Sequence, residues 1–248
     1  MKKVVLITGA SRGIGAATAV LCAKAGWDIV VNYTQNKGAA DTLCDQLHQL
    51  GAKTLCIQAD VGDESQILRM FSQIDSQFGA LHGLVNNAGV VDMTSKVEDM
   101  SWSRLDRMMR INVIGSIYCA KEAIKRMSPL HGGVGGSIVN LSSVAAKIGG
   151  PGQYVDYAAS KGAIDSFTIG LSKELATQNI RVNAVRPGII DTEIHASGGQ
   201  PNRAKDSSSM VPMQRPGTAE EVGKAILWLL SEDSSYTTGS VLDVSGGR

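Results

Sequence analysis

The architecture of this chain is set by one stretch near its start, which reads VVLITGASRGIG at residues 4–15. Residues 3–7 form a short β-branched and leucine run, typical of a strand buried on both faces of a parallel sheet. The glycine-rich turn 8–15 follows, and residues 14–25 have the small and apolar pattern of a helix. This order indicates a phosphate-binding site, because glycines let the backbone approach an anion and a helix N-terminus attracts it. The alternative is a glycine turn without a ligand.

The alternation of short strands and helices continues along the rest of the chain. Further strands are expected at 28–32, 54–59, 81–85, 137–141, 181–185 and 240–244, and helices at 39–50, 64–78, 102–127, 153–177 and 218–231. Strands separated by helices pair in parallel, so we predict an α/β fold with a doubly wound sheet of about seven strands and helices on both faces. A length of 248 residues fits a single domain over 1–248.

Composition and charge narrow the possible partners. The formal net charge of +1 gives no reason to expect a nucleic acid or an anionic membrane. Cys22, Cys44, Cys56 and Cys119 are scattered and lack the spacing of a metal site or a disulfide framework, so we expect buried, reduced thiols and no metal. The apolar run after Met1 is too short for a signal peptide, and no stretch is long enough to span a membrane. We expect a soluble cytoplasmic protein.

The end of the second strand bears on the choice of dinucleotide. NAD-binding folds usually place a carboxylate about 20 residues after the glycines, where it bonds the ribose 2′-hydroxyl. Residues 32–37 read NYTQNK and hold no carboxylate, so a 2′-phosphate would meet no repulsion there. Arg12 and Lys37 could supply positive charge to it. We therefore expect NADP in preference to NAD, unless both cations are solvated surface charges.

Polar residues also follow the other strands. Asp60 follows the third strand, where it could accept a bond from an adenine amino group, although Asp60 or Asp63 could equally cap the next helix. The fourth, fifth and sixth strands end in polar segments at 86–89, 142–143 and 186–192. Asparagine and glycine can make ordinary turns, but the carboxyl ends of parallel strands share the edge where open α/β sheets bind ligands.

The run YAASK at 157–161 places a tyrosine and a lysine one helical turn apart. Residues four apart lie on the same face of a helix, so the side chains of Tyr157 and Lys161 can reach the same small region of space. A fixed cation within about 4–6 Å favours the phenolate and lowers the pKa of a tyrosine from about 10. The alternative is a surface pair at helical spacing. Tyr154 has Ala158 four residues on, and we expect it to line the mouth of the site.

Two further features depart from local patterns. Asn112 lies well inside a strongly helical run, where asparagine is mildly unfavourable, and such a departure is a place to suspect function. From His195 to Pro212 the pattern dissolves into a polar stretch rich in glycine and serine. We expect a substrate lid at about 194–212, with a disordered insertion as the alternative.

Together these motifs resemble those of the short-chain dehydrogenase/reductase family in its single-domain form. The resemblance runs from end to end, in the order Thr8-Gly9-x-x-x-Gly13-x-Gly15, Asp60-Val61, Asn86-Asn87-Ala88-Gly89, Asn112, Ser142-Ser143, Tyr157-x-x-x-Lys161, Pro187-Gly188 and Thr192. It implies a Rossmann-like fold and an NADP-dependent oxidoreductase, with NAD possible, that interconverts a carbonyl and a secondary alcohol by hydride transfer. It also implies a homotetramer paired through 102–127 and 154–177.

The resemblance gives each matching residue a role. Tyr157 would be the general acid or base, Lys161 would depress its pKa and bond the nicotinamide ribose, and Ser143 would hold the substrate oxygen. Asn112 would organise a water that relays protons to Lys161. The interval from Ser143 to Tyr157 is about a residue longer than usual, so choosing Ser143 over Ser142 rests on the Ser-Val-Ala-Ala run. The cofactor would contact, besides Tyr157 and Lys161, Gly9, Ser11, Arg12, Gly13, Ile14, Gly15, Tyr33, Thr34, Asp60, Val61, Asn87, Ala88, Gly89, Pro187, Gly188, Ile190 and Thr192.

The resemblance leaves the substrate open. A 3-oxoacyl-carrier-protein reductase would want a basic docking patch, for which Lys121, Lys125 and Arg126 could serve, but Gln178 stands where that subgroup has an arginine. A sugar or polyol dehydrogenase is a second alternative. A non-catalytic NADP-binding sensor is the third, and the complete acid/base set argues against it.

Overall fold

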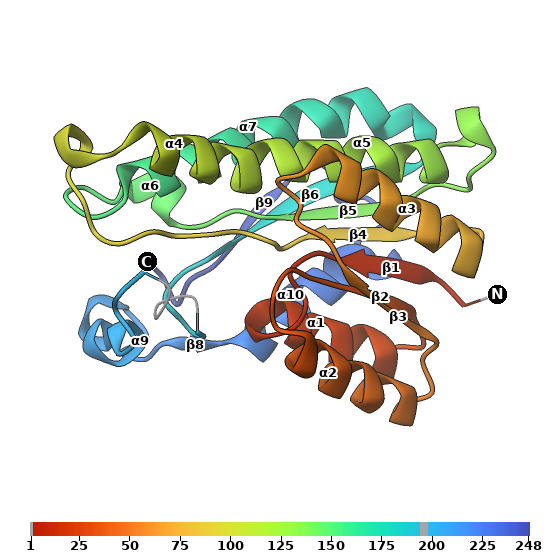
Figure 1. Ribbon diagram of the computed structural model, residues 1–248, viewed down its shortest axis with the longest axis horizontal. Helices are drawn as coiled ribbons and strands as arrows, with labels where there is room; N and C mark the ends of the chain where they lie inside the picture. The colour runs from red at the N-terminus through yellow and green to blue at the C-terminus, as the bar shows by residue number, and fades with distance from the viewer. Residues whose placement is uncertain (1, 194–197) are drawn as a thin grey trace.

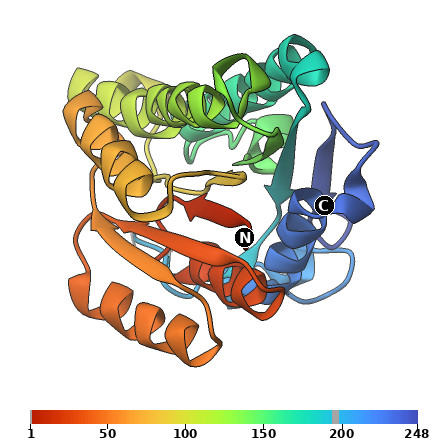
Figure 2. The ribbon, with the colours of Figure 1, turned by 90° about the vertical axis from the view of Figure 1, so that its right-hand side faces the viewer.

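The computed structural model describes residues 2–193 and 198–248. Seven strands form one parallel sheet in the order β3-β2-β1-β4-β5-β6-β9, with helices on both faces (Figures 1 and 2). The strands are β1 (Val4–Ile7), β2 (Asp28–Tyr33), β3 (Thr54–Gln58), β4 (Gly83–Asn86), β5 (Gly136–Leu141), β6 (Ile180–Pro187) and β9 (Val241–Val244). The predicted doubly wound α/β fold is thereby confirmed.

Helices cover the two faces of the sheet as separate layers (Figure 1). One face carries α1 (Gly13–Lys24), α2 (Lys37–Gln49) and α10 (Ala219–Leu230). The other carries α3 (Glu64–Phe78), α4 (Trp102–Met109), α5 (Ser116–Met127) and α7 (Val155–Leu175). The short elements are α6 (Ala145–Ile148), α9 (Arg203–Asp206) and the 3-10 turns at 97–99, 129–131, 176–178, 208–210 and 232–234.

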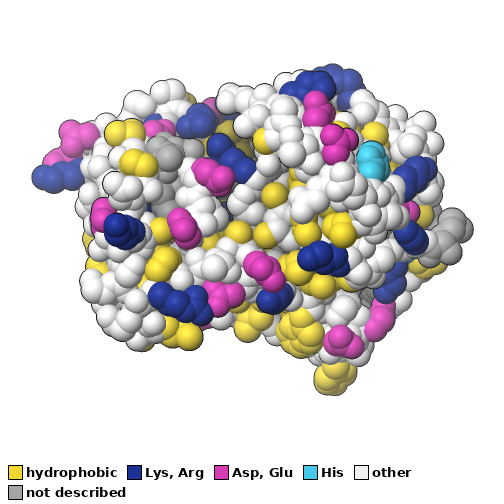
Figure 3. Space-filling view, turned by 90° about the horizontal axis from the view of Figure 1, so that it is seen from below, with side chains coloured by type: hydrophobic (Ala, Val, Ile, Leu, Met, Phe, Trp, Pro, Cys, Tyr) yellow, Lys and Arg dark blue, Asp and Glu magenta, His cyan; other side chains and the backbone are white. Residues whose placement is uncertain are grey.

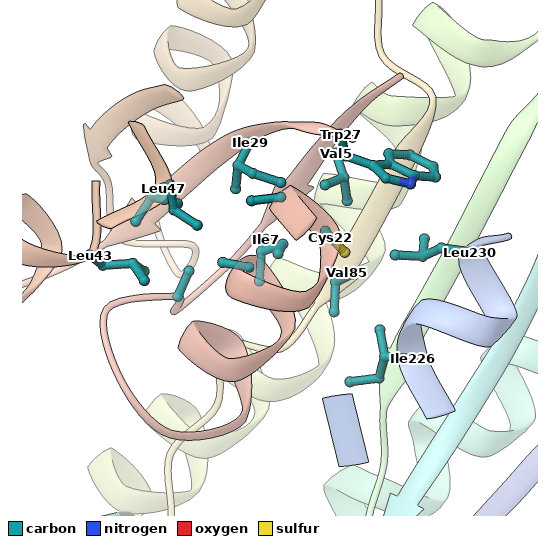
Figure 4. Packing of buried hydrophobic residues seen from close by; sticks show 14 of the residues in the cluster. Val5, Ile7, Cys22, Trp27, Ile29, Leu43, Leu47, Val85, Ile226 and Leu230 are labelled. Atoms are coloured by element: carbon teal, nitrogen blue, oxygen red, sulfur yellow. The ribbon is translucent and has the colours of Figure 1, made fainter. Parts of the chain in front are cut away.

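Each helix layer packs on the sheet through its own apolar core, and β1 contributes side chains to both cores. Val5 and Ile7 pack toward α1, α2 and α10, whereas Val4 and Leu6 pack toward the opposite layer. Successive side chains of a strand point to opposite faces, so a continuous apolar run is what a doubly covered strand requires. Figure 4 shows the first of these cores, in which Val5, Ile7 and Val85 of the sheet face Cys22, Ile226 and Leu230. The sheet edge is thus a fixed base for the site.

Helix caps settle one alternative left open by the sequence. Asp63 is the N-cap of α3 and accepts a hydrogen bond from Gln66 N at 3.0 Å, so Asp60 is not the cap. The predicted cap of the last helix is confirmed as a full capping box, in which Thr218 and Glu221 bond each other's main-chain N–H groups.

The prediction of one α-helix over 102–127 is wrong in its middle. Between α4 and α5 the chain forms a π-helical segment, η2 (Arg110–Gly115), which contains Asn112. A π-turn inserts an extra residue into a helix and is frequent at functional sites. The Ser116 hydroxyl donates to the Asn112 carbonyl at 3.1 Å within this widened turn.

The region predicted as a lid contains regular structure that the sequence did not indicate. Residues 194–197, including His195, lie outside the described residues. Beyond them, α9 and a 3-10 turn follow, and a short parallel pair joins β7 (Ile190–Asp191) to β8 (Gly217–Thr218). These segments extend beyond the carboxyl ends of the main strands (Figure 1).

The surface charges and the four cysteines do not mark a separate site in the part of the chain that the structure describes. On the face seen from below, cationic and anionic side chains are interspersed (Figure 3). Cys22, Cys44 and Cys119 are buried, as predicted, whereas Cys56 is half-buried. No helix within residues 2–193 and 198–248 is long and apolar enough to cross a membrane.

Candidate active site

A cavity of about 360 Å³ opens where the carboxyl ends of β4, β5 and β6 meet. Its lining joins segments that are far apart in the sequence, as the alignment of parallel strand ends requires. Of the residues predicted from the sequence, the cavity is lined by Ile14, Asn87, Gly89, Ser143, Tyr157, Lys161, Pro187, Gly188, Ile190 and Thr192. Ser142 and Tyr154 also line it.

The glycine turn lies beside this cavity and has no room for side chains. Gly9 and Gly13 have φ values of +62° and +57°, a region that residues with a side chain rarely adopt. A Cβ on Gly9 would lie 2.9 Å from the Cα of Ala88, and one on Gly15 would lie 2.6 Å from Nδ2 of Asn87. The glycines are therefore required by conformation and by close packing.

Short polar side chains fix the turn from three strands. The Thr8 hydroxyl accepts bonds from the main-chain N–H groups of Asn87 at 3.0 Å and Ala88 at 2.9 Å. Asn87 Nδ2 donates to the carbonyls of Thr8 at 2.8 Å and Gly9 at 3.0 Å. Asn32 Oδ1 accepts from Gly9 N at 3.1 Å. Sequence reasoning gave Thr8 and Asn32 no role in holding the turn, because a polar residue at a strand end does not reveal its partner.

The start of α1 fits the pyrophosphate of a dinucleotide. The helix begins at Gly13, its N-cap Arg12 makes no side-chain cap, and residues 13–16 include no acid. The first main-chain N–H groups of a helix have no partner within it and bind anions well. Thr192 lies next to this turn, 3.5 Å from where a Cβ on Gly13 would be. The space that the glycines leave open, which we call the cradle, and the first main-chain N–H groups of α1 together fit a pyrophosphate.

One carboxylate near this cradle was not anticipated. Glu193 Oε2 lies 3.8 Å from the position that a Cβ on Gly13 would take. Glu193 is exposed, and its negative charge lies close to the helix end where an anion would bind.

Several predicted contacts at the adenosine end are altered. The Tyr33 side chain is only 5% exposed and packs in the core, and Val61 is buried as well, so only their main chains are available at the sheet edge. Lys37 pairs with Asp41 at 2.7 Å, which offsets its charge. Arg12 and Thr34 are exposed and Ser11 is half-buried.

The Asp60 carboxylate turns back on its own loop. Its Oδ1 accepts a bond from Gly62 N at 2.8 Å, and its main-chain N–H donates to Gln66 Oε1 at 2.9 Å. The loop after β3 is therefore ordered by local bonds, with Asp60 half-buried at the sheet edge.

Tyr157 lies beside Ser143. Burial raises the pKa of Tyr157 above its usual value, and the neighbouring Ser143 hydroxyl, which lowers that pKa, does not outweigh the burial. Ser143 also accepts a bond from Ala145 N at 3.1 Å. Ser142 Oγ instead donates to the Lys161 carbonyl at 3.2 Å. The geometry thus brings Ser143, and not Ser142, to the tyrosine hydroxyl.

Lys161 lies beside Tyr157, but burial has the larger influence on the pKa of the tyrosine. Lys161 Nζ lies 5.6 Å from the centroid of the Tyr157 ring but donates to the Leu141 carbonyl at 2.6 Å. Burial lowers the pKa of Lys161 to about 8, with Asp165 acting in the opposite direction. At neutral pH this lysine is still mostly protonated, and burial remains the largest influence on the pKa of Tyr157.

Asn112 is fully buried and holds the loop after β4. Its Oδ1 accepts from Val90 N at 2.8 Å, and its Nδ2 donates to Val90 O at 2.9 Å. A Cβ on Gly89 would lie 3.4 Å from Asn112 Oδ1 and 3.5 Å from Lys161 Nζ, so this glycine keeps open the space between the two.

A buried ion pair supports the mouth of the cavity. Arg104 of α4 donates to both carboxylate oxygens of Asp156, at 2.7 and 3.1 Å, and to the Met93 carbonyl at 2.6 Å. The two side chains are 10% and 1% exposed. Asp156 precedes Tyr157, so the pair ties the start of α7 to the loop after β4. Nothing in the spacing of the sequence signalled this pair.

Comparisons with known proteins agree with this geometry. A family model described as Enoyl-(Acyl carrier protein) reductase matches residues 9–248. The "Uncharacterized oxidoreductase YgfF" of Escherichia coli is 53% identical over 99% of both chains. The 3-oxoacyl-(acyl-carrier-protein) reductase FabG of Staphylococcus aureus is 33% identical over 100% of this chain and 98% of its own. The crystal structure of a short chain dehydrogenase from Burkholderia cenocepacia in complex with NADP has a TM-score of 0.90 and 29% identity, over 99% of this chain and 97% of that one.

Proposed function

Because this chain belongs to the short-chain dehydrogenase/reductase family, we propose that it is an NADP(H)-dependent oxidoreductase that interconverts a carbonyl and a secondary alcohol. One observation carries the proposal. The side chains of Ser143 and Tyr157 lie side by side at the wall of a cavity beside a cradle that fits a dinucleotide. Two hydroxyls so placed can both address one carbonyl oxygen.

The residues of the site divide the work of catalysis. The glycine turn, the start of α1, Asn87 and Thr192 would hold the dinucleotide, which when bound supplies or accepts the hydride. As a carbonyl is reduced, negative charge develops on its oxygen, and the hydroxyls of Ser143 and Tyr157 stabilise that charge. Tyr157 gives up its proton as general acid, and Lys161, beside it, holds an exchangeable proton near neutral pH.

The raised pKa of Tyr157 keeps its hydroxyl protonated at neutral pH. A phenol whose pKa is raised stays protonated and can donate, which reduction requires. Oxidation requires the phenolate as base, so its rate is expected to rise as the pH becomes alkaline.

The preference for NADP rests on charge at the end of β2. Residues 32–37 hold no carboxylate, and Arg12 is exposed beside the start of α1. The NADP-bound relative described above supports the same choice. Arg12 is the stronger candidate for the 2′-phosphate, because Asp41 already pairs with Lys37.

Reduction of 3-oxoacyl groups on a carrier protein is the second candidate, favoured by the FabG relative. The basic cluster that would dock a carrier protein is largely compensated. Lys125 pairs with Glu122 at 2.7 Å, and Arg126 pairs with Glu122 at 3.0 Å and Asp75 at 2.6 Å. We therefore rank free carbonyl compounds, including sugar or polyol oxidation products, above a protein-bound thioester.

We also propose a homotetramer in the cytoplasm, assembled through α4, α5 and α7. On these helices and on η2 between α4 and α5, the side chains of Trp102, Ile114, Ile117 and Ile169 are 84%, 57%, 39% and 43% exposed, which is unusual for large apolar side chains on a monomer surface. Sedimentation equilibrium is expected to give four chains, and a monomer would contradict the proposal.

A titration and a substrate panel test the function. NADPH is expected to bind more tightly than NADH, as followed by nucleotide fluorescence, and equal affinities would refute the role of Arg12. With NADPH bound, a panel of ketones, aldehydes and 3-oxoacyl thioesters is expected to include compounds that oxidise it. Binding without oxidation across the whole panel would favour the sensor alternative.

A further inference from the structure

The cavity is lined by more positive charge than the proposed chemistry uses. Its charged side chains are Lys161, Arg203 and Arg248, and the described residues that line it include no Asp or Glu. Lys161 is accounted for by its place beside Tyr157. The proposed hydride and proton transfers do not use the guanidinium groups of Arg203 and Arg248. A cavity that faces its ligand with unbalanced cations is suited to an anion.

Arg203 is held in place by neutral groups. Its guanidinium lies 5.0 Å from the centroid of the Tyr154 ring, and Nη1 donates to Gln200 Oε1 at 2.5 Å. The ion pairs formed within residues 2–193 and 198–248 do not include Arg203 or Arg248, and residues 194–197 have no acidic side chain. Arg203 is half-buried, so its charge is partly shielded from water without a carboxylate partner.

Two aromatic contacts connect this cation to the reacting group. The rings of Tyr154 and Tyr157 meet edge to face at a centroid distance of 6.2 Å, and Arg203 stacks on Tyr154. Apolar side chains line the cavity around them, namely Val144, Ile148, Pro151 and Ile189. A ligand in this cavity can therefore contact the hydroxyls of Ser143 and Tyr157, apolar side chains and, beyond the ring of Tyr154, a guanidinium.

We infer that the substrate is a carbonyl compound that bears an anionic group, a carboxylate or a phosphate, separated from the carbonyl by a short apolar chain. This inference rests on the function proposed above and specifies its substrate class. Arg203 binds the anion through its planar fork of N–H donors, which matches carboxylate and phosphate oxygens. Arg248 also lines the cavity; burial raises the pKa of Tyr154, and the charge of Arg248, like that of Arg203, acts to lower it.

Matched substrates test the inference. A short-chain oxo acid, its neutral methyl ester and a ketone of similar length with a phosphate monoester are each supplied with NADPH, and their kcat/KM values are compared. The wild-type protein is expected to prefer an anion over the ester by about tenfold or more. Preference between the carboxylate and the phosphate identifies which of the two anions the site takes.

Variants in α9 separate binding of the anion from general damage. Arg203→Gln is expected to lower kcat/KM for the anionic ketone by about tenfold to a hundredfold and to leave the ester almost unchanged. Arg203→Lys keeps the charge without the fork and is expected to lose less. Lys205→Gln is the matched control, because Lys205 is exposed on the same short helix and does not line the cavity. Unchanged NADPH affinity shows that each variant is folded.

The outcomes distinguish this inference from the proposed function. If the wild-type protein reduces the ester as well as the acid, or if Arg203→Gln affects both equally, the anionic substrate is refuted while carbonyl reduction stands. If no member of a broad carbonyl panel oxidises NADPH, the proposed function is refuted, and the inference falls with it.

Discussion

The glycine turn between β1 and α1 and the cavity wall around Arg203 lie at the same edge of the sheet, but different atoms build them. The turn depends on main-chain conformation, with Gly9 and Gly13 at positive φ and with side chains of neighbouring strands bonded to its carbonyl and N–H groups. The wall depends on side chains, since Arg203 stacks on Tyr154, which packs against Tyr157.

This difference indicates which properties can change independently. A substitution in the turn must alter the backbone that receives the dinucleotide, because a Cβ has no space there. A substitution in the wall alters what the cavity accepts and leaves the turn intact. Binding of the dinucleotide and choice of substrate should therefore respond to different variants.

The largest effect is expected from a variant that removes proton transfer and leaves dinucleotide binding at the glycine turn intact. Tyr157→Phe removes the proton donor while it keeps the ring that packs against Tyr154. We expect kcat to fall by about 10²–10⁴-fold, the usual contribution of a general acid, with NADPH affinity nearly unchanged. Steady-state kinetics and a fluorescence titration measure both quantities, and turnover close to wild type would remove Tyr157 from the mechanism.

Lys161 lies between Gly89 and Tyr157, and its burial should make the stability of the protein depend on pH. Its pKa is lowered from 10.5 to about 8, so between these values the unfolded chain holds a proton that the folded protein has lost. The stability that this lysine contributes is therefore present above the unfolded pKa and lost as the pH falls through 8. Relative to Lys161→Met, the wild-type free energy of unfolding should rise by about 1.4 kcal/mol per pH unit above pH 8.

Urea unfolding of both proteins between neutral pH and mildly alkaline pH measures this difference. A difference that does not change with pH would mean that Lys161 titrates normally, and the buried position described above would then be incorrect. The variant also loses the donor to the Leu141 carbonyl, but that loss is the same at every pH.

Gly15→Ala is expected to break the turn while it spares the wall. Its Cβ would lie 2.6 Å from Asn87 Nδ2 and 2.9 Å from the Ala10 Cα, so the cradle must shift. We expect NADPH affinity to fall by about tenfold to a hundredfold, the equivalent of a typical overpacking cost. Gly170→Ala is the control, since a Cβ there meets nothing within 4 Å. Equal behaviour of the two variants would show that the turn tolerates side chains.

The smallest effect concerns the one carboxylate seen beside the turn. Glu193→Gln removes a negative charge near the N-terminus of α1, where the pyrophosphate is expected. We expect NADPH to bind about threefold more tightly at low salt, with the gain reduced at high salt because the site is exposed. Weaker binding to the variant, by calorimetry, would instead make Glu193 a positive contributor.

The contrast between turn and wall also explains what the sequence could predict. Strand runs, glycines and the Tyr157–Lys161 spacing are local patterns with physical causes, so the sheet, the cradle and the cap at Thr218 could be predicted from them. The pair of Arg104 and Asp156 and the stacking of Arg203 join residues about 50 apart in sequence, which no local pattern signals. The π-turn at Asn112 and the raised pKa of Tyr157 depend on packing and burial, which emerge only in the folded chain.

The most direct test of the account follows the transferred hydrogen. Wild-type protein is given NADPH with both hydrogens of the reactive nicotinamide carbon replaced by deuterium, together with a carbonyl compound that it turns over, and the alcohol product is analysed by mass spectrometry and NMR. The account predicts deuterium on the carbinol carbon of the product, with Tyr157→Phe giving the same product far more slowly. An alcohol without deuterium, or no alcohol from any carbonyl compound, would contradict it.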